Sequence, residues 1–331
     1  MDLGLLFIPD KKIPKITMLS EIAEKSGFKY IWVADENFYR DVYITLTSIA
    51  IATSKIFLGP GCTNPYTRHP AMTALAMATL NELSKGRAVF AIGSGGINLL
   101  DPLNLTAKKP LSAIEDFIKV FKKIVAGEKA TLISESFSMK NVRLAFTPSG
   151  EIPVYIACRG PKMLKLAGKV AEGVLLGSVP LEYIKVAKEF IEEGKSLVGR
   201  DSGKFEIANS IIFSASSDRE KAFDLAKPYL IYSLAATPEY ILKVVGFSQN
   251  DIKPIIKALP DEKKASEEIT KEIVEKFAIA GTIDECIDKI KAYANVGVTQ
   301  LVCSSPIGED EKEIIESLGK KFLRETKDYY A

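Results

Sequence analysis

Two adjacent carboxylates, Asp35 and Glu36, directly follow a short apolar run, Tyr30–Ala34, that has the pattern of a buried strand. They form the one adjacent acid pair at a strand end, where a carboxyl group can deliver a proton to a bound substrate. Single loop acids such as Asp10 and Asp101 are more often helix caps or solvated charges. The sequence therefore predicts general acid catalysis by Asp35 and Glu36.

The stretch "LGPGCTNPYTRHP" (58–70) concentrates backbone-shaping residues after another apolar run. Glycine recurs at most of the predicted strand ends, and without a Cβ it lets the backbone approach a flat or anionic ligand. The only histidine, His69, precedes Pro70 at a predicted helix start, where a cap fits it as well as catalysis does. With one histidine the chain offers no Ser-His-Asp triad.

The segment "CRGPKMLKLAG" (158–168) is typical of a helix that binds phosphate at its start. Pro161 suits the first helical position, and Gly160 leaves the preceding amides unshielded. Arg159 adds a cation that can bind phosphate or carboxylate. An ordinary well-started helix accounts for the same pattern, so both interpretations stay open.

The elements that must position these residues alternate regularly along the chain. Strand-length apolar runs are predicted at 3–8, 30–34, 56–58, 88–92, 154–157, 174–176, 207–213 and 300–303. Amphipathic helices are predicted between them, at 16–25, 42–53, 71–83, 111–125, 162–170, 181–198, 219–234 and 283–295. Strands that are apolar throughout and joined by helices pair in parallel. The order predicts a (β/α)₈ TIM barrel rather than a doubly wound sheet, which would open with a glycine-rich turn after its first strand.

The domain organisation follows from the same pattern. One barrel domain is expected over residues 1–331. Residues 127–150 alternate in β fashion and predict a hairpin excursion before the fifth strand. Residues 237–280 predict a helical insertion before the eighth strand, placed near the mouth of the barrel or at an oligomer contact.

The composition argues against several classes of partner. Apolar residues make up 47%, and the formal net charge is only +2, so nucleic acid is not an expected partner. The four cysteines lie far apart and no C-x-x-C pair occurs, so no metal site is expected. Neither a signal peptide nor a membrane span is predicted, and reduced cysteines indicate a cytoplasmic protein. A rim of glycines with few acids suits a redox cofactor that supplies the chemistry itself.

Four segments carry a resemblance to a known family. They are "GLLFIPD" (4–10), "LGPGCTNPYTRHPAMTALAMATLNELSKGRAVFAIGSG" (58–95), "IACRGPKMLKLAGKVAEGVLLGS" (156–178) and "VGVTQLVCSSPIG" (296–308). The chain resembles archaeal methylene-tetrahydromethanopterin reductase, a luciferase-like family that uses the deazaflavin coenzyme F420. The resemblance implies a luciferase-like barrel in which reduced F420 gives a hydride to the methylene carbon of a pterin.

The resemblance also implies roles for particular residues. The bond Gly61–Cys62 is expected to be a non-prolyl cis peptide that presses on the back of the deazaflavin ring. Thr63, Asn64 and Ser94 would line the ring edge, with Asp35 and Glu36 near the site. Residues expected at the phosphate tail are Gly160, Pro161, Gly177 and Ser178. A homodimer or homotetramer is expected as well.

Departures from the family pattern leave alternatives open. Members that reduce this pterin carry an acid where this chain has Leu6, a histidine at Glu36 and an aspartate at Gly96. Either Glu36 or Asp35 supplies the proton, or the substrate differs. The alternatives are a luciferase-like oxidoreductase that uses F420 or FMN on an alcohol, aldehyde or alkanesulfonate, and a non-catalytic binding or subunit-stabilising protein.

Overall fold

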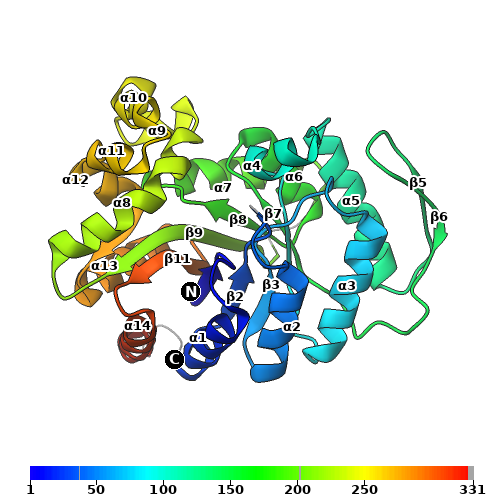
Figure 1. The fold of residues 1–331 in the computed structure, drawn as a ribbon. Helices are drawn as coiled ribbons and strands as arrows, with labels where there is room; N and C mark the ends of the chain where they lie inside the picture. Colours follow the sequence, from blue (N-terminus) through cyan, green and yellow to red (C-terminus); the bar gives the residue numbers. More distant parts are fainter. Residues whose placement is uncertain (37, 201–202, 327–331) are drawn as a thin grey trace.

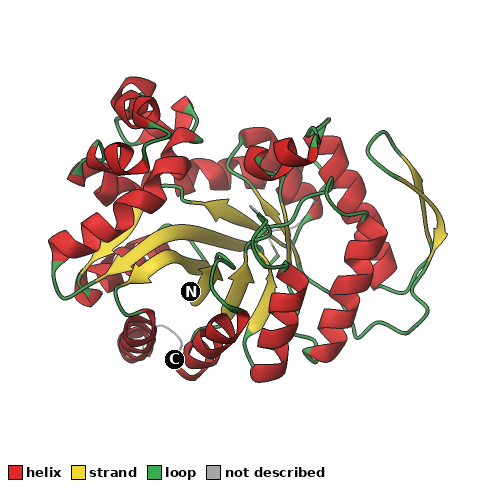
Figure 2. Ribbon diagram, in the orientation of Figure 1, coloured by secondary structure: helices red, strands yellow, loops and turns green. Residues whose placement is uncertain are grey.

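A computed structural model describes residues 1–36, 38–200 and 203–326. In this part of the chain, eight parallel strands surround a common axis, with helices outside them (Figures 1 and 2). The barrel strands are β1 (Asp2–Phe7), β2 (Tyr30–Val33), β3 (Phe57–Pro60), β4 (Phe90–Ile92), β7 (Val154–Ala157), β8 (Gly173–Gly177), β9 (Glu206–Ala215) and β11 (Gln300–Gly308). The predicted TIM barrel is confirmed.

The barrel closes between β3 and β4. Continuous pairing runs from β3 through β2, β1, β11, β9, β8 and β7 to β4. The remaining gap is joined by isolated parallel bridges, Leu58 to Ala88 and Thr63 to Ile92. The second bridge lies beyond the end of β3, so it also fixes the loop that follows this strand.

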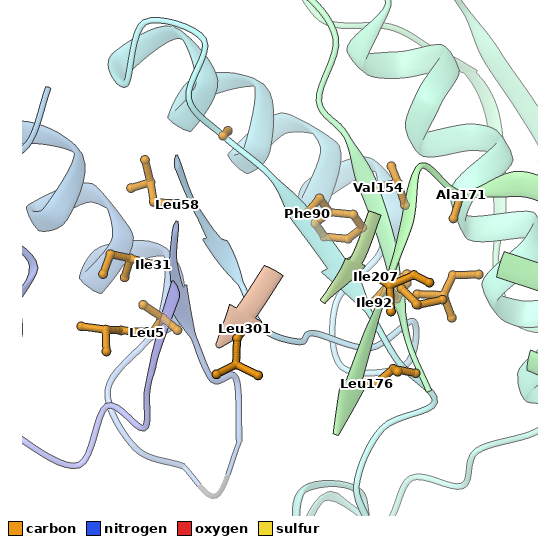
Figure 3. Packing of buried hydrophobic residues seen from close by; sticks show 14 of the residues in the cluster. Leu5, Ile31, Leu58, Phe90, Ile92, Val154, Ala171, Leu176, Ile207 and Leu301 are labelled. Atoms are coloured by element: carbon orange, nitrogen blue, oxygen red, sulfur yellow. The ribbon is translucent and has the colours of Figure 1, made fainter. Parts of the chain in front are cut away.

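Helices cover the outside of the barrel. They are α1 (Ile13–Lys25), α2 (Val42–Ala52), α3 (Pro70–Leu83), α5 (Pro110–Val125), α6 (Pro161–Val170), α7 (Leu181–Ser196), α8 (Arg219–Ala235), α13 (Ile283–Asn295) and α14 (Glu311–Thr326). The outward side chains of the strands form one large apolar core with the helices, in which Leu5, Ile31 and Leu58 belong to consecutive strands (Figure 3). A smaller interior cluster holds Trp32 and Tyr155, whose rings meet edge to face at 5.3 Å. The interior is therefore packed below the mouth.

An excursion between α5 and β7 holds two antiparallel strands, β5 (Ala130–Ile133) and β6 (Ser138–Val142). They project from one side of the barrel in Figure 1. Phe137, between the two strands, packs edge to face on Phe117 of α5 at 6.3 Å. This contact attaches the hairpin to the helical layer.

The insertion before the last strand begins after α8. It contains α9 (Glu239–Val244), α10 (Gln249–Ala258), α11 (Glu262–Glu267) and α12 (Lys271–Phe277), which gather beside α8 in Figure 1. These helices bury an apolar core of their own with α8. The segment ends in a strand, β10 (Ala278–Gly281), which pairs with β9 and was expected to be helical. It is too short and too close to α12 for periodicity to separate it.

Three further elements differ from the expectation. The short α4 (Ile97–Leu100), the 3₁₀ turn η1 (Asp101–Leu103) and the C-terminal helix α14 were not predicted. Asp101 lies exposed in that turn, away from the acid pair's pocket. Among the described residues, no helix combines the length and apolar character that crossing a membrane requires.

Arg87 connects α2, α3 and the start of β3, and it is 8% exposed. Its guanidinium donates hydrogen bonds of 2.7–2.9 Å to the backbone oxygens of Ala50, Thr53, Ile56 and Ser84 and to the Thr53 hydroxyl. We expect Arg87→Met to lower the free energy of unfolding by about 3 kcal/mol, because several buried acceptors lose their donor. Urea unfolding measures the change.

Arg143→Met is the matched control for this prediction, because Arg143 is exposed. The same substitution there should change the free energy of unfolding by less than about 0.5 kcal/mol. Equal effects at the two positions would show that the buried network does not stabilise the barrel.

Candidate active site

A pocket of about 400 Å³ opens at the carboxyl ends of the barrel strands. It is lined by Ala34, Asp35, Glu36, Gly61, Cys62, Thr63, Asn64, Gly93, Ser94, Gly95, Gly96, Leu99, Ala157 and Ala236. These residues follow β2, β3 and β4 or, in the case of Ala157, end β7, all at one end of the barrel. The exceptions are Leu99 in α4 and Ala236 after α8. A volume of this size accommodates a ring system of several fused rings.

The loop after β3 supplies one wall of the pocket. The bond Gly61–Cys62 is a non-prolyl cis peptide, as the sequence resemblance implied. Gly61 N–H donates to the Val33 oxygen at 2.8 Å, and Thr63 N–H donates to the Ala91 oxygen at 3.1 Å. Burial raises the pKa of the Cys62 thiol to about 12, so this side chain is a neutral thiol at the wall of the pocket.

The rim glycines fall into two groups. A Cβ on Gly59 would overlap the Val89 oxygen, and one on Gly61 would lie 2.7 Å from the Trp32 Cβ, so these two glycines serve close packing of strands. A Cβ on Gly96 or Gly177 would meet no atom within 4 Å. Open backbone facing a ligand is therefore available at Gly96, whereas the glycines of "LGPGC" are required by the barrel itself.

The acid pair lies on the neighbouring wall. Asp35 is half-buried, and its Oδ2 accepts a 2.7 Å hydrogen bond from the Thr63 hydroxyl. Glu36 is exposed to solvent at the pocket surface, and the pocket wall partly desolvates its carboxyl. This desolvation raises the pKa of Glu36, and the nearby Asp35 charge raises it further. The pair can therefore keep a proton above the pH at which an ordinary glutamate loses it.

Asn64 and Ser94, both predicted site residues, line the same pocket. The Asn64 side-chain oxygen accepts hydrogen bonds from the Tyr66 and Thr67 amides at 2.9 and 3.0 Å, so it shapes the loop that it belongs to. Ser94 is exposed at the pocket surface. Asn64 thus has a structural role in addition to any contact with a ligand.

The other predicted binding residues lie outside this lining. Gly160 precedes α6 and Pro161 begins it, while Gly177 ends β8 and Ser178 follows. The Ser178 amide donates to the Ser210 oxygen at 2.6 Å and is not free for a phosphate. These residues form a second group on the β7–β8 side of the mouth.

Arg159 uses part of its guanidinium for contacts inside the protein. Its guanidinium donates to the Thr237 hydroxyl at 3.1 Å and to the Ala236 oxygen at 2.8 Å. Since Ala236 lines the pocket, Arg159 attaches the start of the insertion to the barrel mouth. The sequence predicted the insertion near the mouth or at an oligomer contact, but it missed Ala236 and Leu99, which no local motif marks.

His69 acts as a helix cap. Its Nδ1 accepts a hydrogen bond from the Ala71 amide at 3.2 Å, at the start of α3. The other ring nitrogen, Nε2, lies 3.2 Å from the Ser138 oxygen of β6. His69 does not line the pocket, so the capping interpretation is the one that the geometry supports.

Comparisons with known proteins place this geometry in context. A sequence profile of the luciferase-like monooxygenase family matches residues 9–300. The chain is 35% identical to 5,10-methylenetetrahydromethanopterin reductase of Archaeoglobus fulgidus, covering 99% of this chain and 100% of that protein. It is 34% identical to the protein of the same name from Methanolobus tindarius, covering 98% and 100%.

A solved structure shows the same architecture. The coenzyme F420 dependent tetrahydromethanopterin reductase of Methanopyrus kandleri superposes with a TM-score of 0.93 at 32% identity, covering 98% of this chain and 99% of that chain. An F420-dependent secondary alcohol dehydrogenase superposes with a TM-score of 0.82 at 21% identity, which is a likeness of fold.

Proposed function

We propose that this protein reduces a methylene-tetrahydromethanopterin to the methyl form with coenzyme F420. The chain belongs to the luciferase-like monooxygenase family and, within it, to the 5,10-methylenetetrahydromethanopterin reductases. The observation that carries the proposal is the pocket at the strand ends, where an acid pair and an open glycine edge share one cavity.

The residues present fit a deazaflavin ring. Cys62 and Ala157 line the pocket and pack on the interior cluster, which gives the pocket an apolar floor. The backbone at Gly96 is open, so a flat ring can approach it without meeting a side chain. We assign ring contacts to Cys62, Thr63, Asn64 and Ser94 together with Gly61. For the phosphate tail we assign Gly160, Pro161, Gly177 and Ser178, the last through its hydroxyl because its amide donates to the Ser210 oxygen.

Reduced F420, when bound, supplies a hydride. The pocket walls hold the two reactants against one another and exclude water, and such orientation can contribute roughly 7–11 kcal/mol to the barrier reduction at best. Glu36 holds a proton and gives it to a pterin nitrogen, so that the substrate becomes a better hydride acceptor. Leu6, which stands where members that reduce this pterin carry an acid, cannot donate a proton.

Binding and turnover test the proposal separately. The purified protein is titrated in parallel with oxidised F420 and with FMN, and it is then assayed with reduced F420 and methylene-tetrahydromethanopterin. We expect F420 to bind more tightly than FMN and the methyl product to form. Tight FMN binding without F420 binding would overturn the proposal in favour of a flavin-dependent relative. A protein that binds neither coenzyme would be the non-catalytic alternative.

We further propose that the α2–α3 face joins two copies of the chain. These helices pack side by side (Figure 1) and leave five large apolar side chains exposed, which are Ile44, Ile51, Met72, Leu75 and Leu83. α2 carries no charged residue, and in α3 the first charge is Glu82. An uncharged face can meet its own copy across a two-fold axis without repulsion between like charges.

Charge introduced on this face should separate the copies. We expect Ile51→Lys and Leu75→Lys each to convert the homodimer to a monomer, because two like charges would be buried at the two-fold interface. Sedimentation velocity measures the mass. Ile133→Lys, at a side chain 86% exposed on β5, is the control and should leave the dimer intact. A wild-type protein that sediments as a monomer would refute this arrangement.

The four cysteines are all free thiols, two of them fully buried. Free thiols in a protein of this size fit the reducing conditions of the cytoplasm. We therefore place the enzyme there, in the one-carbon metabolism of an archaeal cell.

A further inference from the structure

Thr63 joins the ends of three consecutive barrel strands. Its amide donates to the Ala91 oxygen at 3.1 Å, and its own oxygen accepts from the Gly93 amide at 2.9 Å. Its hydroxyl donates to Asp35 Oδ2 at 2.7 Å, and the residue is only 1% exposed. A threonine has one hydroxyl proton and one amide proton, so both of its donors are used inside the protein. It can offer a ligand no hydrogen-bond donor.

Two groups near Asp35 stabilise its negative charge, whereas no described group does so for Glu36. Burial raises the pKa of Asp35, and the Asp41 carboxylate at the start of α2 adds to this. The Thr63 hydrogen bond and the Arg68 guanidinium act in the opposite direction. Arg68 lies over the Tyr43 ring at 4.7 Å.

Glu36 has no such support among the described residues. The Glu36 side chain is exposed at the pocket surface and accepts no hydrogen bond from a described residue. Partial desolvation raises its pKa, and the Asp35 charge raises it further. Two carboxylates in one pocket titrate as a coupled pair, and a single proton goes to the member whose charge is less well stabilised. Cys62, which also faces the pair, is a neutral thiol.

We propose that Thr63 is a positioning residue that fixes Asp35 as the ionised member of the acid pair and thereby leaves the shared proton on Glu36. The inference rests on the proposed function, because Glu36 is the proton donor there. It changes the role of Thr63 from a contact with the coenzyme ring to control of the acid that donates the proton. During turnover the proton passes from the Glu36 carboxyl to a substrate nitrogen, and Glu36 becomes a carboxylate.

The decisive variant is Thr63→Val, which keeps the shape of the side chain and both backbone hydrogen bonds. Asp35 then holds a proton more readily and competes with Glu36. The plateau of kcat should fall about tenfold, as expected for the loss of a hydrogen bond to a charged group. At the same time, the pH at which kcat declines should move upward, because the pair as a whole binds its last proton more tightly. Thr63→Ser should restore both values.

A second variant keeps the test independent of how well Thr63→Val folds. Asp35→Asn removes the neighbouring negative charge from Glu36, so the pH at which Glu36 loses its proton should move to a lower value. Carboxyl carbon NMR of Asp35→Asn measures this pH without relying on turnover, and a Glu36 midpoint that stays unchanged or moves upward would overturn the inference. A lowered plateau with an unmoved pH midpoint in Thr63→Val would reduce Thr63 to a structural role.

A measurement without coenzyme separates this inference from the proposed function. Carboxyl carbon NMR of the labelled protein follows the titration of Asp35 and Glu36 directly. In the wild type the last proton should leave Glu36, and in Thr63→Val it should be shared with Asp35. The same titration in both proteins would refute the role of Thr63. If the titrations differ as expected but Glu36→Gln turns over normally, the inference stands for the pair and the proposed role of Glu36 fails.

Discussion

Replacing Glu36 with glutamine is expected to lower kcat for methylene-pterin reduction by about 10²–10⁴-fold, the usual contribution of a general acid. Glutamine keeps the size and polarity of the side chain but has no acidic proton. Affinity for oxidised F420 should stay essentially unchanged, because the variant removes an interaction made only as the substrate is protonated. Steady-state kinetics and coenzyme fluorescence titration measure the two quantities.

The pH dependence of the wild type tests the same role. Glu36 must carry a proton to act, and partial desolvation in the pocket together with the Asp35 charge raises its pKa above the ordinary 4.5. Because only the protonated form is active, kcat is constant below that raised pKa and falls about tenfold per pH unit above it. In Glu36→Gln this decline should be absent from the residual rate. If Glu36→Gln turns over at the wild-type rate, Glu36 is not the proton donor.

The barrel could be predicted because its strands are uniform. Val154–Ala157 is apolar throughout, starts after a proline and is followed by a helix, so periodicity alone gives its bounds. β10 lacked those signals: its four residues follow α12 without a break, and it becomes a strand only through pairing with β9. Local pattern therefore fails where pairing with a distant strand decides the structure.

The site could be predicted in part, for a related reason. Asp35 and Glu36 are adjacent in the sequence, so their proximity needs no fold to be inferred. The hydrogen bond from Thr63 to Asp35 joins residues 28 positions apart and depends on the side-chain orientation of both. The same limit applies to Arg159, whose bonds reach across 77 and 78 positions to the insertion. Residue type suggests what a group can do, and only the fold decides which partner it meets.

The rim glycines show most clearly that sequence alone does not reveal a residue's role, and Gly96 gives a second prediction with a large effect, on F420 affinity. Gly96 lines the pocket, lies outside the left-handed backbone region and has no atom within 4 Å of a Cβ position. We expect Gly96→Phe to fold normally and to lose about a thousandfold or more in F420 affinity, roughly 4 kcal/mol, because the ring would occupy the edge left open for the coenzyme. Fluorescence titration measures the affinity, and thermal unfolding verifies the fold.

Two alanine variants, at Gly96 and at Gly59, are the controls that separate an effect on coenzyme binding from an effect on stability. Gly96→Ala adds one methyl group and should weaken F420 binding far less than Gly96→Phe, without changing the melting temperature. Gly59→Ala should do the opposite, since its Cβ would overlap the Val89 oxygen where β3 approaches β4, and the barrel would lose stability. Equal melting temperatures for Gly59→Ala and Gly96→Ala would contradict the division of the rim glycines. Unchanged F420 affinity in Gly96→Phe would place the coenzyme elsewhere, because a phenyl ring and a deazaflavin cannot share that edge of the pocket.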